Sequence, residues 1–269
     1  MKTDSRNDEW TARSITEKSY LAGLVVLFAA AYSQYLISGL GPILGFVIVY
    51  GVPIVATGLL WGRPIIRRAF SRKYDALKFG LGFFGALSVM AMLLSLGLLY
   101  VIVAFDPRAV SLLNRPNPVL NVPPEFAWIM VGVSILIVGP AEECLFRGFV
   151  YGGLLSLFKG QHWISLAFIS SMLFGAAHLY YAIVYGVSSL LPFTDLVTFG
   201  MAMAITYYLS GGDLAIPAAI HGVYDATGFL GVASSPELGN LLRWCMTISG
   251  ILVAIALFVQ RIRKRKTPR

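Results

Sequence analysis

Residues 126–158 read FAWIMVGVSILIVGPAEECLFRGFVYGGLLSLF, an apolar stretch that contains three charged side chains. The three are Glu142, Glu143 and Arg147. A run of about 20 apolar residues is long enough to cross a bilayer as a helix. Ionisable groups at that depth are costly, so they usually face the protein interior and serve a function. This segment therefore predicts a membrane helix that carries functional charges.

The whole chain has the composition of a membrane protein. Of its 269 residues, 57% are hydrophobic and 13% are charged, whereas soluble domains carry about 25% charged residues. We predict an all-α, polytopic membrane protein that forms a single domain over residues 1–269. About eight segments are long enough to span the bilayer: residues 19–38, 41–61, 79–105, 126–151, 164–184, 196–209, 214–233 and 241–259. The fourth helix is expected to continue to about Phe158.

The predicted helices divide into a core and flanking parts. We expect helices 4 to 7, at about residues 126–233, to bundle into a catalytic core. Residues 1–125 would add further N-terminal helices, and residues 260–269 form a basic tail. The proline-rich segment 106–125 cannot be regular helix throughout, and we interpret it as an external connector.

Net charge is +8, and the basic residues lie in blocks. One block contains Arg63, Arg67, Arg68, Arg72, Lys73 and Lys78, and the other forms the C-terminal tail. Basic residues that flank membrane helices mark the cytoplasmic side. We therefore expect both termini to be cytoplasmic in a multi-pass protein, in the plasma membrane of a prokaryote, and we expect no nucleic-acid partner.

Spacing within the charged segment predicts one ion pair and one carboxylate without a charged neighbour. Residues four apart share a helical face, so Glu143 and Arg147 can pair. Glu142 points about 100° away, by the rotation of one helical residue, and has no charge partner within the segment. Such a carboxylate is suited to general acid or base catalysis. The alternative is a salt bridge between helices that has no catalytic role.

Two later apolar segments each carry a histidine. His178 ends the sequence FGAAH at residues 174–178, and its small neighbours are expected to leave open space, and a path for water, around the ring. His221 is followed four residues later by Asp225, on the same helical face. Asp225 is placed to orient the histidine, to bind a metal or to carry a proton. By helical rise, Glu142 and His178 lie at similar depths, but His221 lies nearer the start of its span. A shared site therefore requires the seventh span to tilt or to start earlier.

Taken in order, these motifs resemble those of the CPBP intramembrane proteases. That family includes the type II CAAX prenyl endopeptidases and the bacteriocin-processing (ABI) proteins. Its pattern is EExxxR, then FxxxH, then HxxxN or HxxxD. Here it reads Glu142 to Arg147, Phe174 to His178, and His221 to Asp225. The resemblance covers roughly residues 126–233.

The resemblance implies hydrolysis of a peptide bond in or near the bilayer. Glu142 and His178 would activate a water molecule, and His221 with Asp225 would stabilise the oxyanion. Glu143, Arg147 and Phe174 would support the site. A membrane-associated peptide or lipidated protein, such as a prenylated CAAX sequence, would be the substrate, and membrane lipids would be the surroundings.

One departure from the asparagine form of the pattern leaves the role of Asp225 open. An ionised Asp225 accepts hydrogen bonds but cannot donate one to an oxyanion; it would instead fix the His221 tautomer. The protease could be glutamate-dependent without a cofactor, or could use a divalent metal such as zinc, held by His178, His221 and either Glu142 or Asp225. Outside the protease class, the polar groups would suit a proton- or ion-coupled transporter or a non-catalytic membrane scaffold of the same fold.

Overall fold

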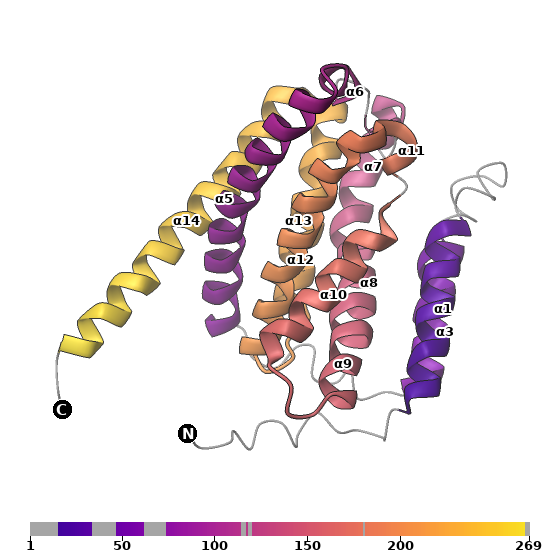
Figure 1. Ribbon diagram of the computed structural model, residues 1–269, viewed down its shortest axis with the longest axis vertical. Coiled ribbons are helices and arrows are strands. Elements are labelled where there is room, and N and C mark those ends of the chain that lie inside the picture. The colour runs from indigo at the N-terminus through magenta and orange to yellow at the C-terminus, as the bar shows by residue number, and fades with distance from the viewer. Residues whose placement is uncertain are drawn as a thin grey trace.

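The computed structural model describes residues 16–33, 47–61, 74–113, 117, 120–179 and 181–266, and within them every regular element is a helix (Figure 1). Four helical segments are long and apolar enough to cross a membrane: Leu77–Phe105, Pro124–Leu157, Tyr181–Leu209 and Pro236–Ile262. Val47–Ala56 and Trp163–Ala177 are shorter apolar helices. The predicted all-α membrane class is therefore confirmed, whereas the count of about eight spans is not.

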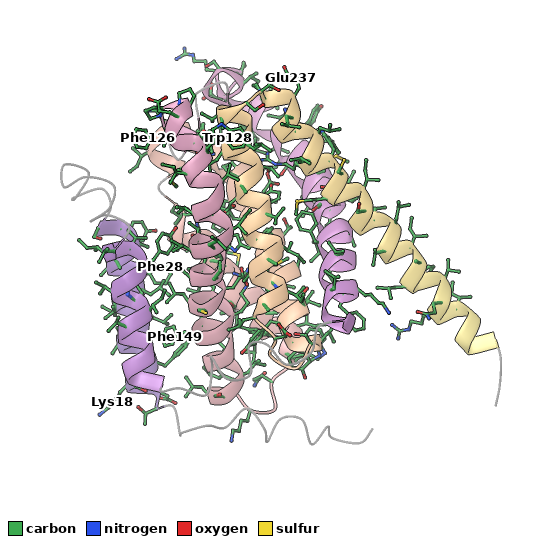
Figure 2. All side chains as sticks on the ribbon, turned by 180° about the vertical axis from the view of Figure 1, so that it is seen from behind. Lys18, Phe28, Phe126, Trp128, Phe149 and Glu237 are labelled. Carbon is green, nitrogen blue, oxygen red and sulfur yellow. The ribbon has the colours of Figure 1, made fainter. Side chains whose placement is uncertain are left out.

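The N-terminal part forms a separate layer at one side of the bundle (Figure 1). It contains α1 (Glu17–Ser33), the π-helical turn η3 (Val47–Gly51) and α3 (Val52–Trp61), and α1 packs against both of the others. In Figure 2, Phe28 of α1 and Phe149 lie at the junction of this layer with the rest of the protein. The predicted connection between the first two helices lies outside the described residues.

One long helical run occupies the middle of the protein, and we refer to it as the central helix. It consists of α7 (Pro124–Val133), η5 (Ser134–Val138), α8 (Gly139–Glu143), η6 (Cys144–Tyr151) and α9 (Gly152–Leu157). Pro124 is in its first turn, where a missing N–H costs nothing. Phe158 is its C-cap, so the predicted continuation to this residue is confirmed.

The predicted fifth and sixth helices have different boundaries in the structure. Helix α10 spans Trp163–Ala177 and ends at His178, rather than continuing to residue 184. A second helical run then passes through α11 (Tyr181–Tyr185), η7 (Gly186–Ser189) and α12 (Leu190–Leu209), so the sixth span begins well before residue 196. The hydropathy pattern could not place this break, because both sides of it are apolar.

The remaining helices complete the bundle around the central helix. Helix α5 (Tyr74–Phe105) packs against α12 and α14 (Pro236–Lys266), and α13 (Ala215–Ala233) packs against α7, α8 and α14. The short α6 (Ala109–Leu113) lies in the segment predicted as an external connector. Buried apolar side chains of η6, α10 and α12 form a core that also includes residues of α1.

Candidate active site

The central helix is irregular on both sides of its two glutamates. Glu142 and Glu143 end α8, which lies between the π-helical segments η5 and η6. Pro140 lies inside this helix and cannot donate the usual backbone hydrogen bond, and π-helical turns accommodate such interruptions. Both glutamates are buried, Glu143 completely. The α-helical geometry is therefore interrupted on both sides of the short segment that carries the two carboxylates.

Two glycines bring α13 against the central helix. A Cβ atom on Gly139 would lie 2.6 Å from the Ala218 carbonyl oxygen, and one on Gly222 would lie 2.7 Å from Cα of Ile135. Small residues permit such close backbone approach between membrane helices. Because Gly222 follows His221 directly, this contact places the histidine beside the two glutamates. Helix α13 begins at Ala215, no earlier than predicted, and His221 nevertheless lies beside Glu142.

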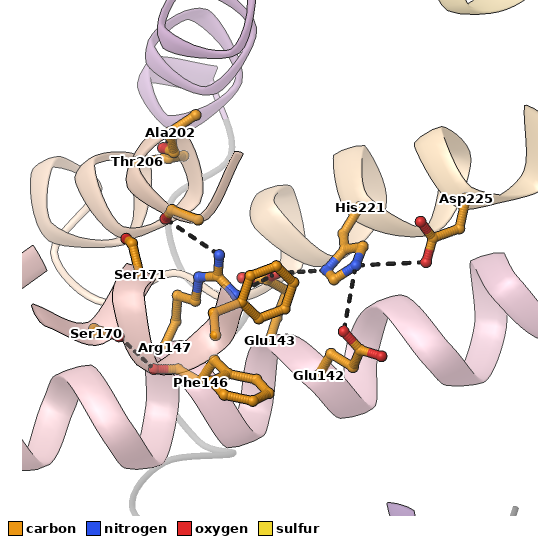
Figure 3. A network of polar contacts seen from close by, with 12 residues as sticks. Glu142, Glu143, Phe146, Arg147, Ser170, Ser171, Ala202, Thr206, His221 and Asp225 are labelled. Carbon is orange, nitrogen blue, oxygen red and sulfur yellow. Dashed lines mark hydrogen bonds and ion pairs between the residues drawn. The ribbon is translucent and has the colours of Figure 1, made fainter. Parts of the chain in front are cut away.

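Glu143 connects His221 to Arg147 (Figure 3). Its Oε1 atom lies 2.6 Å from Nδ1 of His221 and 3.1 Å from Nη1 of Arg147. Arg147 is almost fully buried and also donates from Nη2 to the Gly200 carbonyl of α12, at 3.2 Å. The predicted pairing of Glu143 with Arg147 is present, and Glu143 in addition bonds to one of the predicted catalytic histidines.

Glu142 lies against both histidines. Its Oε2 atom is 3.6 Å from Nε2 of His221 and 3.9 Å from Nε2 of His178. Both distances exceed that of a direct hydrogen bond, so Oε2 of Glu142 faces both rings without bonding directly to either. Glu142 has no charge partner within its own segment, and the structure supplies two titratable neighbours from other helices.

His178 occupies the C-terminal end of α10 rather than the middle of a span. It is the C-cap residue, and its Nδ1 lies 2.8 Å from the Phe174 carbonyl oxygen. A carbonyl only accepts hydrogen bonds, so Nδ1 carries the proton and donates. A histidine that bonds to a carbonyl of the last turn also terminates the helix favourably. The ring is thereby held with Nε2 directed at Glu142.

Phe174 forms an apolar wall beside these groups. Its ring centroid is 4.8 Å from that of His178 and 5.8 Å from that of His221, and the guanidinium carbon of Arg147 lies 4.7 Å from the ring centre. An arginine over an aromatic face is stabilised by the ring quadrupole. Phe174 therefore contacts both histidines and the buried cation.

Asp225 lies at the more open end of the group. Its Oδ2 atom is 3.4 Å from Nε2 of His221, and its side chain is 33% exposed, against 4% for His221. One alternative held that Asp225 fixes the tautomer of His221. In the structure Glu143 bonds to Nδ1, and Asp225 instead approaches the nitrogen that also faces Glu142.

The open space expected beside His178 is absent at Gly175. A Cβ atom there would lie 2.8 Å from the Phe193 ring and 3.0 Å from a methyl group of Val197. Gly175 therefore allows α12 to pack closely on α10 and leaves no open space at this position. The small size of Gly175 did not itself indicate which side chain of a neighbouring helix packs against it.

Two contributions to the site had no motif in the sequence. Tyr50, from the N-terminal layer, donates a hydrogen bond from its hydroxyl to Oε1 of Glu142 at 2.9 Å. The Gly200 carbonyl accepts from Arg147. A single tyrosine in the apolar segment 47–56 carried no signal except its polarity, and a backbone carbonyl carries none.

The side chains predicted as metal ligands do not form a metal centre in this arrangement. Among the described residues, no three histidine, cysteine or acidic side chains are grouped so that they could hold an ion. A catalytic zinc site uses three protein ligands at about 2.0–2.2 Å for nitrogen and oxygen. We therefore derive no chemical step through a metal.

Comparison with known proteins gives one match. A family model described as type II CAAX prenyl endopeptidase Rce1-like matches residues 124–227. That stretch contains the central helix, α10, α12 and most of α13, and with them every predicted site residue. No curated protein and no solved structure matches the chain.

Proposed function

Since residues 124–227 assign the chain to the CPBP/CAAX protease family, we propose that Glu142, His178 and His221 form the catalytic site of an intramembrane endopeptidase. The observation that carries the proposal is the approach of Nε2 of both histidines to one oxygen of Glu142. These side chains come from three different helices in an otherwise apolar bundle. Such convergence is expected of a site that acts on one small molecule, here the attacking water.

Glu142 is the general base in this proposal. Water binds between its Oε2 atom and Nε2 of His178, and donates a hydrogen bond to each, because Nδ1 of His178 already carries the ring proton. The water oxygen attacks the carbonyl carbon of the scissile peptide bond while its proton passes to Glu142. The carbon–nitrogen bond then breaks, and Glu142 returns the proton to the leaving amine.

His221 stabilises the negative charge on the tetrahedral intermediate. Its Nδ1 donates to Glu143, so Nε2 can donate to the oxyanion only when the ring carries both protons. Glu143, Glu142 and Asp225 supply negative charge around it, and Arg147 balances part of that charge. A fixed donor of this kind in a dry site stabilises developing charge more strongly than water does.

The substrate in this proposal is a membrane-associated peptide or a lipidated protein, and a prenylated CAAX sequence is one example. The basic blocks favour a topology with both termini in the cytoplasm, and a prokaryotic plasma membrane as the location. Surrounding lipids would then present the lipid chain of the substrate to the site.

A cleavage assay in liposomes tests the assignment. Glu142→Gln and His178→Gln are each expected to lower kcat by about 10²- to 10⁴-fold, the usual contribution of general acid–base catalysis. Glu125→Gln and His162→Gln serve as controls, because both side chains are exposed. Wild-type cleavage by Glu142→Gln would overturn the proposal.

Two further arms separate the alternatives. A farnesylated peptide and its unmodified counterpart, each assayed with and without chelator, distinguish substrate classes and reveal a metal requirement. Loss of activity with chelator that zinc restores would assign a metalloprotease. Proton or ion flux in the same liposomes, without cleavage of either peptide, would instead indicate a transporter.

A further inference from the structure

Tyr50 reaches the candidate site from outside the part of the chain that matches the family. It lies in η3, whereas the match begins at residue 124. Its hydroxyl donates to Oε1 of Glu142 at 2.9 Å, and Oε2 of the same carboxylate faces the two histidines. The two oxygens of Glu142 therefore have different partners: one is bonded to the N-terminal layer, and the other faces the reacting position.

The N-terminal layer is held against the same two helices that carry Glu142 and His178. Tyr20 of α1 donates to the Val150 carbonyl of the central helix at 3.0 Å, and its ring lies 5.5 Å from that of Phe149. Tyr32 donates to the Ala176 carbonyl of α10 at 2.6 Å. Contacts on both helices fix the position from which Tyr50 approaches Glu142.

The bond from Tyr50 restricts how Glu142 can turn. A carboxylate on a flexible side chain rotates about its terminal bond with little preference, so the plane of an unrestrained Glu142 carboxylate would vary relative to the water. A phenol bonded to one oxygen restricts that rotation and keeps the other oxygen facing both histidines. Misplacing a catalytic group by about 1 Å can cost about 100-fold in rate.

We propose that Tyr50 is a positioning residue, and that the N-terminal helices complete the active site by fixing the Glu142 carboxylate. The inference rests on the proposed function, because it assigns Tyr50 a role through Glu142. It assigns a catalytic purpose to residues before 124 that the three sequence motifs do not cover.

Kinetic comparison of two tyrosine variants tests this role. Tyr50→Phe retains the ring and removes only the hydroxyl; we expect kcat to fall by about 10- to 100-fold, with KM changed less than about twofold because bound substrate does not contact Tyr50 in this proposal. Tyr20→Phe is the matched control. It removes a buried hydroxyl that joins the N-terminal layer to the same helix, but it does not touch Glu142. Its kcat should stay near that of the wild type, because the Tyr20 ring still packs on Phe149 and Tyr32 still bonds to α10, so the N-terminal layer stays docked.

A double-mutant cycle measures the coupling in kcat between Tyr50 and Glu142. This coupling is not expected if Tyr50 only docks the helices. Glu142→Asp shortens the side chain and withdraws the carboxylate from Tyr50, so Tyr50→Phe in that background should cost much less in kcat than it does in the wild type. Additive losses would overturn the positioning role. Equal losses from Tyr50→Phe and Tyr20→Phe would also overturn it, and would indicate a role in helix packing.

The outcomes separate this inference from the proposed function. If Glu142→Gln is inactive while Tyr50→Phe keeps the wild-type kcat, the inference fails and the protease assignment stands. If Glu142→Gln is fully active, the proposed function fails, and the role given to Tyr50 fails with it. Thermal unfolding of each variant in detergent identifies any loss of activity that follows from loss of the fold.

Discussion

His221 and Glu143 are joined at 2.6 Å, between Nδ1 of the ring and Oε1 of the carboxylate. The same oxygen lies 3.1 Å from Nη1 of Arg147. Glu143 therefore both neutralises a buried cation and orients a proposed catalytic ring. Sequence spacing suggested only the contact between Glu143 and Arg147, because His221 lies 78 positions from Glu143.

Glu143→Gln should damage stability and catalysis together. The amide retains the shape of the side chain but leaves Arg147 as a buried charge without its carboxylate, and breaking a buried pair costs about 3–5 kcal/mol. His221 also loses the anion that favours its doubly protonated form. We expect a clear fall in Tm and a fall in kcat of about 100-fold, measured in detergent and in liposomes. Glu125→Gln, at the exposed start of the same helix, is the control. A variant with the Tm of the wild type would show that the pair contributes little to the fold.

A double variant, Glu143→Gln with Arg147→Met, should separate the two roles of Glu143. Replacing a buried ion pair with uncharged side chains of similar size is often neutral or stabilising, so the Tm should recover relative to Glu143→Gln alone. Activity should not recover, because no anion is restored at Nδ1 of His221. Unfolding and cleavage assays on the same preparations check both expectations. Recovery of kcat together with Tm would mean that Glu143 acts on catalysis through stability alone.

Asp225 should tolerate asparagine better than alanine. An amide oxygen still accepts a hydrogen bond from His221, and the amide nitrogen adds a donor that the ionised carboxylate lacks. We expect Asp225→Asn to keep kcat within about threefold of the wild type, and Asp225→Ala to lower it by about 10-fold or more. Steady-state cleavage rates measure the difference. Equal losses in the two variants would show that the negative charge of Asp225 is itself required.

Several features of the site followed from local spacing in the sequence. The pairing of Glu143 with Arg147 needs only a helix, because residues four apart share a face. Ionisable residues in apolar helices turn inward because lipid cannot solvate them, and the structure indeed brings Glu142, His178 and His221 together. These arguments depend on the helix and the bilayer alone, so they hold without knowledge of the tertiary structure.

Features that depend on contacts between distant segments could not be predicted in this way. The end of α10 at His178 depends on a ring-to-carbonyl bond, the filling of Gly175 depends on Phe193, and Tyr50 reaches Glu142 across 92 positions. The segments involved are all apolar, so hydropathy does not show which residues within them make these contacts. A single sequence therefore indicated that Glu142, His178 and His221 meet, but not what holds them in place.

Packing at Gly222 should be as important to activity as the side chains themselves. A Cβ atom there would lie 2.7 Å from Cα of Ile135, so Gly222→Ala must push α13 away from the central helix. Overpacking of this kind typically costs about 1–3 kcal/mol, and the displacement would also move His221 relative to Glu142 and Glu143. We expect a lower Tm and a fall in kcat of about 100-fold, by the cost of misplaced catalytic groups.

Gly231→Ala is the matched control for Gly222→Ala, because it makes the same change on the same helix. A Cβ atom at Gly231 would meet Cα of Pro236 at 3.6 Å, an ordinary contact. Alanine is also the better helix former by about 1 kcal/mol, so Gly231→Ala should leave Tm equal to or above that of the wild type and should not change kcat. If the two variants instead behaved alike in unfolding and cleavage assays, the close approach of α13 to the central helix would not be what places His221.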